Sequence, residues 1–89
     1  MNDFALNVDV SQLPAPEPMQ KIIQMLSNLP KGHYLSVFHR KKPETLFSIL
    51  EQQHYQWHHT SNDIEQHVIF IWPSQDEQAK RHFMAHQHI

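Results

Sequence analysis

Apolar positions recur along the chain with two different periods, and these periods predict the elements of its fold. Residues 6–10 alternate apolar and polar side chains, as a strand with one buried face does. Across residues 19–29 apolar side chains recur every three or four positions, which predicts a helix with one buried face. Glu17 and Pro18 suit its first turn, where an acidic side chain is favourable and a backbone donor is dispensable.

The second half of the chain shows the same two patterns. Residues 34–38 predict a second strand, and a second helix is expected over residues 43–53. Residues 55–60 and 68–72 predict two further strands. The polar segment 61–63 between them is typical of a turn, so these last two strands should form an antiparallel hairpin.

The C-terminal part of the chain adds one more element. The uninterrupted apolar run at residues 68–72 indicates a strand that is covered on much of both faces. Ser74 and Glu77 resemble a capping box, which predicts a third helix from Pro73 or Ser74 to about His86. The predicted order is therefore β-α-β-α-β-β followed by a helix. Right-handed crossovers place both early helices on one face of the sheet, so we predict a two-layer α/β sandwich.

Composition limits what such a domain can do. The chain has 89 residues, enough for one domain over 1–89, and its formal net charge of −2 indicates no general attraction to nucleic acid. It contains no cysteine, which excludes disulfides, thiolate catalysis and cysteine-ligated metal centres. The first residues are not basic, and no stretch approaches the roughly 20 apolar residues that cross a bilayer. We therefore expect a cytoplasmic protein without a membrane partner.

The segment between the first strand and the first helix resembles the signature of the TusA/SirA-like family. In that signature a strand ends in an acidic residue, and Cys-Pro-x-Pro then begins a helix. Asp9 matches the acidic residue, and Pro16 and Pro18 match the two prolines. Ala15 stands in the position of the cysteine. Four further segments resemble a cysteine-free branch, the domain-of-unknown-function family 2249: Leu29-Pro30-x-Gly32, His39-Arg40-x-x-Pro43, residues 46–50 and Tyr55-x-Trp57.

This resemblance covers about residues 4–72 and leaves a helical extension over about 73–89. It implies a mixed four-stranded sheet packed on two helices, as the periodicity also predicts. In the sulfur-carrying relatives the cysteine accepts a persulfide at a helix N-terminus, where the dipole favours the anion. Ala15 has no thiol, so we expect no sulfurtransferase activity. Because the sequence also has no nucleophile elbow, glycine-rich phosphate loop or paired-carboxylate motif, we expect no enzyme.

A basic segment before the second helix is the first candidate site. The segment consists of His39, Arg40, Lys41 and Lys42, and we call it the basic loop. Positive charge is unfavourable at a helix N-terminus, so these cations indicate a phosphate, carboxylate or nucleic-acid ligand. The alternative is a solvated turn whose charges are screened by salt.

The proline-rich segment is the second candidate site. It is either a docking surface kept from the family or simply the turn that begins the first helix. With the acidic residue that precedes it, this site consists of Asp9, Pro14, Ala15, Pro16, Glu17 and Pro18.

Histidine is unusually frequent, with nine residues. His82 and His86 are four positions apart on the expected last helix, a spacing at which two imidazoles can share zinc, copper or nickel. The alternative is that His82 and His86 belong to an exposed, polar helix end, in which case we expect no cofactor. The histidines around the hairpin are expected to be exposed on their strands: His54, His58, His59 and His67. The alternative is that His67 opposes His58 or His59 across the ladder.

Together these features favour a non-catalytic module that binds a partner protein or a small anion through the proline-rich segment and the basic loop. Two other functions follow from the same residues. One is binding of a transition metal by the histidines, and the other is binding of RNA or single-stranded DNA by the basic loop. We expect a monomer or a weak homodimer.

Overall fold

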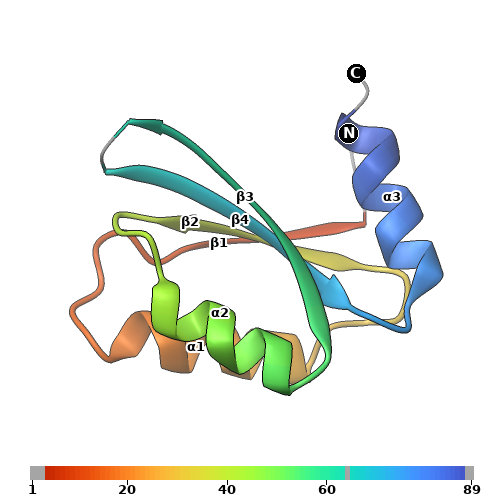
Figure 1. The fold of residues 1–89 in the computed structure, drawn as a ribbon, viewed down its shortest axis with the longest axis horizontal. Coiled ribbons are helices and arrows are strands. Elements are labelled where there is room, and N and C mark those ends of the chain that lie inside the picture. The colour runs from red at the N-terminus through yellow and green to blue at the C-terminus, as the bar shows by residue number, and fades with distance from the viewer. Residues whose placement is uncertain (1–3, 64, 88–89) are drawn as a thin grey trace.

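The order of elements is the one that the periodicity predicts. The computed structural model describes residues 4–63 and 65–87, and Figure 1 shows their arrangement. The elements are β1 (Ala5–Asp9), α1 (Glu17–Ser27), β2 (Tyr34–His39), α2 (Glu44–Gln52), β3 (Tyr55–Asp63), β4 (Gln66–Pro73) and α3 (Glu77–Gln87).

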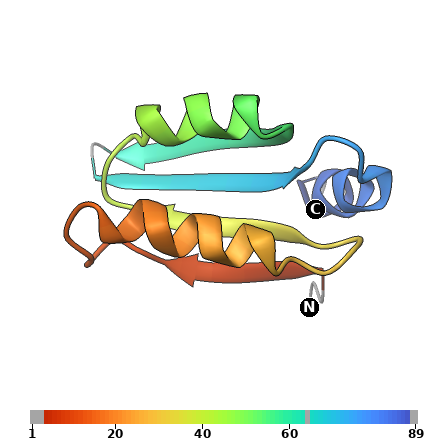
Figure 2. The ribbon, with the colours of Figure 1, turned by 90° about the horizontal axis from the view of Figure 1, so that it is seen from below.

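The strands form one mixed sheet in the order β1-β2-β4-β3. β1 and β2 are parallel, and β4 runs antiparallel to both of its neighbours, β2 and β3. The mixed sheet and the two-layer arrangement are confirmed, with α1 and α2 on one face (Figure 2). The second crossover does not join neighbouring strands, because β4 returns from the hairpin and inserts itself between β2 and β3.

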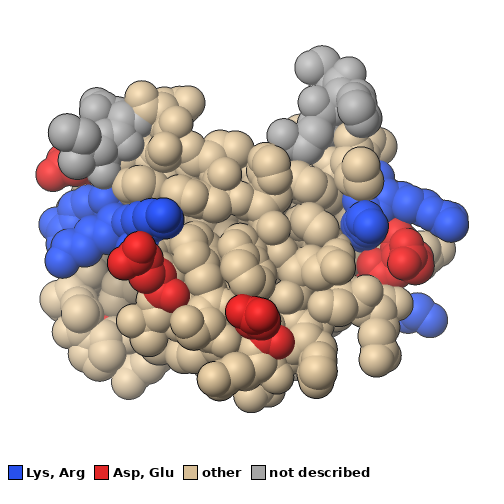
Figure 3. All heavy atoms as spheres, viewed as in Figure 1, with Lys and Arg blue, Asp and Glu red and all other residues tan. Residues whose placement is uncertain are grey.

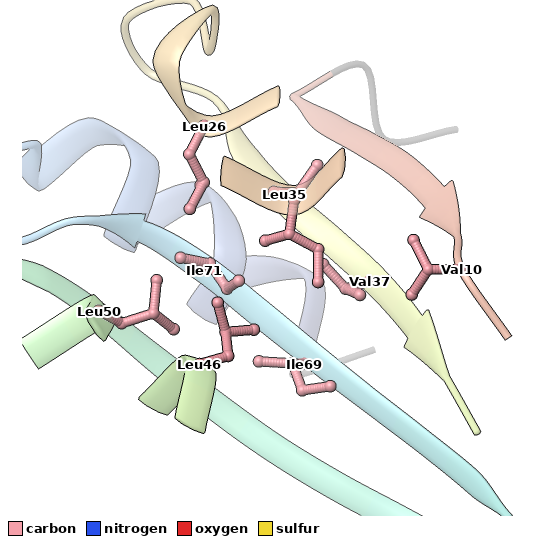
Figure 4. Close-up of a cluster of buried hydrophobic side chains, with 9 residues drawn as sticks. Val10, Leu26, Leu35, Val37, Leu46, Leu50, Ile69 and Ile71 are labelled. Atoms are coloured by element: carbon pink, nitrogen blue, oxygen red, sulfur yellow. The ribbon is translucent and has the colours of Figure 1, made fainter. Parts of the chain in front are cut away.

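The main core lies between the sheet and the helices α1 and α2. Every second residue of β2 and β4 faces these helices, because side chains alternate along a strand. The buried side chains point toward one another from both layers (Figure 4). Nine residues form this cluster: Val10, Ile22, Leu26, Leu35, Val37, Leu46, Leu50, Ile69 and Ile71.

A smaller cluster lies on the other face of the sheet. There α3 packs Ala79 and Phe83 against Tyr34 of β2 and Trp72 of β4. The indole nitrogen of Trp72 donates a hydrogen bond of 3.1 Å to Gln56 Oε1, which satisfies its only donor. Apolar residues therefore run without interruption along β4 because this central strand is covered by α1 and α2 on one face and by α3 on part of the other.

The turn of the hairpin lies later than predicted. Residues 61–63 belong to β3 rather than to the turn, and the ladder continues through the pairs Ser61↔His67 and Asp63↔Gln66. Asn62 has no partner of its own, so the strand contains a bulge at this point. Polar composition indicated a turn here because a bulged, exposed strand end tolerates the same residue types.

The start of α3 also differs from the prediction. Pro73 ends β4, and the helix begins at Glu77 instead of at Pro73 or Ser74. Asp76 is the capping residue, since its Oδ1 accepts the backbone N–H of Ala79 at 3.0 Å. Its Oδ2 accepts the N–H of Gly32 at 2.7 Å, and so joins α3 to the loop before β2. The capping-box pattern therefore predicted a cap near the correct start of α3 but assigned it to Ser74 instead of Asp76.

We expect Asp76→Ala to destabilise the fold by about 2 kcal/mol, because one substitution removes a helix cap and a second charge-assisted hydrogen bond. Asp76→Asn should lose about half as much, since asparagine also caps helices well. Urea denaturation measures both values. Gln75→Ala, an exposed neighbour, is the control, and an equal loss in Asp76→Ala and in this control would contradict the assignment.

Candidate ligand-binding groove

The two helices on the main face begin at the same end of the molecule (Figure 2). Each follows a proline at its N-cap position, Pro16 for α1 and Pro43 for α2. Neither helix has a side chain that caps its first turn. The partial positive charge of both helix dipoles is therefore directed to one region, where Glu17 and Glu44 in the first turns offset part of it.

A groove of about 390 Å³ lies at this end, between the two helices. It brings together the proline-rich segment and the basic loop, which are more than twenty residues apart in the sequence. Apolar side chains form its floor and walls, and cationic side chains lie at its edge. Its lining consists of Ala15, Pro16, Pro18, Met19, Ile22, His39, Lys41, Lys42, Pro43, Glu44, Thr45 and Leu46.

Several residues of the two candidate sites do not line this groove. The carboxylate of Asp9 instead accepts hydrogen bonds from Ser11, at 2.6 Å from the hydroxyl and 2.9 Å from the backbone N–H. These bonds lower the pKa of Asp9 and shape the turn after β1. Pro14 and Glu17 are exposed beside the groove. Met19, which was expected on the buried face of the first helix, and Thr45 also line the groove, although neither was a candidate site residue.

Arg40 faces a neighbouring depression of about 540 Å³. Lys41 and Lys42 line both this depression and the groove, so the basic loop separates the two. Glu65 and His67 complete the lining of the depression. The carboxylate of Glu65 reduces the local positive charge in this depression.

Ala15 lies exposed at the edge of the groove, directly before the N-cap of α1. The peptide bond between Ala15 and Pro16 is cis. No residue of the chain provides a thiol.

Lysine and arginine side chains gather at the end where α1 and α2 begin, next to acidic side chains, and others lie at the opposite end of the molecule (Figure 3). Lys41 and Lys42 are exposed and extend over the groove. Glu44, in the first turn of α2, is the acidic side chain in the same lining. The groove thus combines an apolar interior with an edge at which positive charge exceeds negative charge.

Three histidines lie close together beside the groove, a cluster of which the sequence suggested only a contact of His67 across the hairpin. His39 ends β2 and pairs with His67 of β4 in the ladder. His59 Nε2 and His67 Nδ1 are 2.9 Å apart, a hydrogen bond in which one ring donates and the other accepts. We predicted exposed strand histidines, and for His67, which is only 8% exposed, that prediction is wrong.

The signal for this cluster was the spacing of the histidines. His67 is two residues before the buried Ile69, and His59 is two residues after Trp57. Side chains two positions apart in a strand share a face. Both imidazoles therefore face the helices, where His59 contacts Phe47 of α2 with ring centroids 5.6 Å apart.

Burial and positive neighbours keep two of these histidines neutral. Burial lowers the pKa of His39, and the positive charges of His67, Arg40 and Lys41 lower it further. Burial also lowers the pKa of His59, followed by the charges of His67, Lys42 and His58. The neutral state has a structural role as well, because His39 Nδ1 accepts the backbone N–H of Lys41 at 3.0 Å.

The two histidines of α3 have different surroundings. His82 Nδ1 lies 2.7 Å from the carbonyl of Gly32, and its ring stacks on Phe4 with centroids 3.5 Å apart. His86 is exposed. Within residues 4–63 and 65–87, no group of three or more histidine or acidic side chains is arranged to hold a metal ion. Metal binding by His82 and His86 stays a prediction.

A family model for uncharacterized conserved proteins, DUF2249, matches residues 7–73. The chain belongs to this family. The match includes the proline-rich segment, the basic loop and the whole groove, and leaves α3 outside. No curated protein and no solved structure gives a significant match. Among the described residues of this family member, no helix is long and apolar enough to cross a membrane.

The histidine cluster predicts that the fold loses stability in mild acid. A folded-state pKa below the unfolded value of about 6.5 means that the unfolded chain binds more protons. The contribution of His39 and His59 is therefore complete above that value and falls as the pH decreases through it. In His39→Gln/His59→Gln, the free energy of unfolding should fall less steeply between about pH 7.5 and pH 5.5 than in the wild type.

Urea denaturation at several pH values measures this slope. His86→Gln, which changes an exposed histidine on another element, is the control and should keep the wild-type slope. Equal slopes in the double variant and the wild type would show that the cluster does not titrate as described.

Proposed function

We propose that this protein is a non-catalytic binding module, and that its groove binds the anionic group of a small molecule or of a partner protein. One observation supports this function above all others. The starts of two helices without capping side chains, and the lysines of the basic loop, converge on one apolar groove.

The electrostatics of the groove favour an anion. The dipole at each helix start attracts phosphate or carboxylate groups. The first N–H group of each helix contributes less, because Glu17 donates to the Pro14 carbonyl and Glu44 to the Lys42 carbonyl. Lys41 and Lys42 add two full positive charges at the same edge. A bound anion would relieve the repulsion between these lysines and the start of α2. The apolar walls would exclude water and strengthen each of these contacts.

We also infer a common origin with the TusA/SirA-like sulfur carriers, followed by loss of the sulfur chemistry. The position of Ala15 supports this inference, because it precedes α1 at the edge of the groove. In a sulfur carrier, the same place would hold a persulfide in the field of the helix dipole. The module would then keep the anion-attracting helix start and bind a separate ligand there.

Removal of the lysines tests the proposed function. We expect Lys41→Gln/Lys42→Gln to weaken binding of inorganic phosphate or acetate roughly tenfold, because two charge-assisted contacts are lost. Isothermal titration calorimetry at low salt measures the affinities, and added salt should weaken binding in the wild type.

Lys80→Gln/Arg81→Gln is the matched control, since it removes the same charge from α3, on the other face of the sheet. Its affinity should equal that of the wild type. Equal weakening in the two double variants would indicate a response to net charge alone and would overturn the groove as the binding site.

A further inference from the structure

The space between α1 and α2 is hollowed at a second place, away from the anion-binding end. α1 packs chiefly on β2 and α2 chiefly on β3, rather than on each other. A second depression, of about 310 Å³, lies between the same helices near their C-terminal ends. Its apolar lining consists of Ile23, Leu26, Ile49, Leu50 and Tyr55.

The two depressions follow one another along the helices. Ile22 and Leu46 line the first, and Leu26 and Leu50 line the second. Each pair on one helix is four residues apart, which is one turn or about 6 Å. The depressions are therefore one helical turn apart along α1 and also along α2. Along α1, which has 11 residues, they extend over a length of about 16 Å.

Two apolar side chains in these depressions do not pack against the core clusters. Met19 of α1 lines the first depression and Ile49 of α2 lines the second. Both are half-buried. Among the described residues, neither belongs to a core cluster or packs against one. They leave apolar surface facing the space between the helices, where a ligand with apolar parts would cover it.

The two ends of this space differ in charge. Lys41 and Lys42 lie at the N-terminal end, with the positive ends of both dipoles. At the C-terminal end the polar lining residues are the uncharged Ser27 and Gln53, and neither helix has a basic residue in its last turn. The dipoles contribute partial negative charge there. An elongated ligand would therefore place its anionic group at one end only.

We propose that the ligand is a single-chain amphiphile, with a carboxylate head beside Lys41 and Lys42 and an aliphatic tail between α1 and α2. This inference depends on the proposed function and names the chemical class of the ligand. Each depression lies at the small end of the range for small-molecule sites. That size favours a thin aliphatic chain over a partner's helix, which is about 10–12 Å across with its side chains.

A series of carboxylates of increasing length tests the tail. Acetate, hexanoate, octanoate and decanoate are titrated into the protein by calorimetry, all below their micelle-forming concentrations. We expect Kd to fall roughly two- to fourfold for each methylene added, the range that burial of a methylene group allows. Octanol and octylammonium test the head, and both should bind more weakly than octanoate because the groove edge is cationic.

Two variants separate the head from the tail. Ile49→Gln, which changes a residue of the second depression only, should flatten the dependence on chain length and leave the affinity for acetate unchanged. Lys41→Gln/Lys42→Gln should remove the preference for octanoate over octanol and leave the effect of chain length. Met84→Gln, which changes an exposed methionine of α3, is the control and should behave as the wild type does. Circular dichroism confirms that each variant is folded.

The outcomes distinguish this inference from the function on which it depends. Binding of acetate and phosphate at the lysines without any gain from chain length would overturn the amphiphile and leave the anion-binding function intact. Equal affinity for octanoate, octanol and octylammonium would overturn both. Absence of binding by every probe, phosphate included, would also overturn both.

Discussion

The order of the strands is the constraint on which the rest of the structure depends. β4 lies between β2 and β3, so the second helical crossover passes over an inserted antiparallel strand instead of joining neighbours. Because β1, β2 and β3 run in the same direction, α1 and α2 also run in the same direction and begin at the same end. The inserted β4 keeps the two helices over different strands. A groove between two helix starts follows from this topology before any side chain is considered.

The side chains then give this groove its chemistry. Pro16 and Pro43 begin the two helices without a capping side chain, which leaves the positive ends of the dipoles exposed to a ligand. The basic loop increases that charge at a cost to the fold, because cations at a helix start repel the dipole. His39 and His59 show the same crowding, since neighbouring positive charges add to the effect of burial in lowering the pKa of each. The concentration of positive charge is the main support for the proposal that the groove binds an anion.

Periodicity was sufficient to predict the elements, their order and the face on which α1 and α2 lie, because alternation and helical spacing directly reflect burial. Two boundaries were predicted wrongly, the hairpin turn and the start of α3. The bulge at Asn62 and the cap at Asp76 depend on single hydrogen-bonding choices that several polar residues can make. The place of β4 in the sheet was suggested only indirectly, by an apolar run too continuous for an edge strand.

The candidate site was less predictable than the fold. The sequence identified the proline-rich segment and the basic loop as separate features, and only the fold places them in one groove. Asp9 was a candidate site residue, yet its carboxylate is bonded to Ser11 and does not line the groove. The contact between His59 and His67 depends on a strand register that the expected strand, beginning at residue 68, did not include.

The groove between the helix starts is the central claim, and an amide NMR titration with octanoate tests it most directly. If the account is correct, the largest chemical-shift changes will occur at Met19, Ile22 and Thr45, around the starts of α1 and α2. If the largest changes instead occur at Gln56, His58 or α3, on the opposite face of the sheet, the ligand binds elsewhere and the account is wrong.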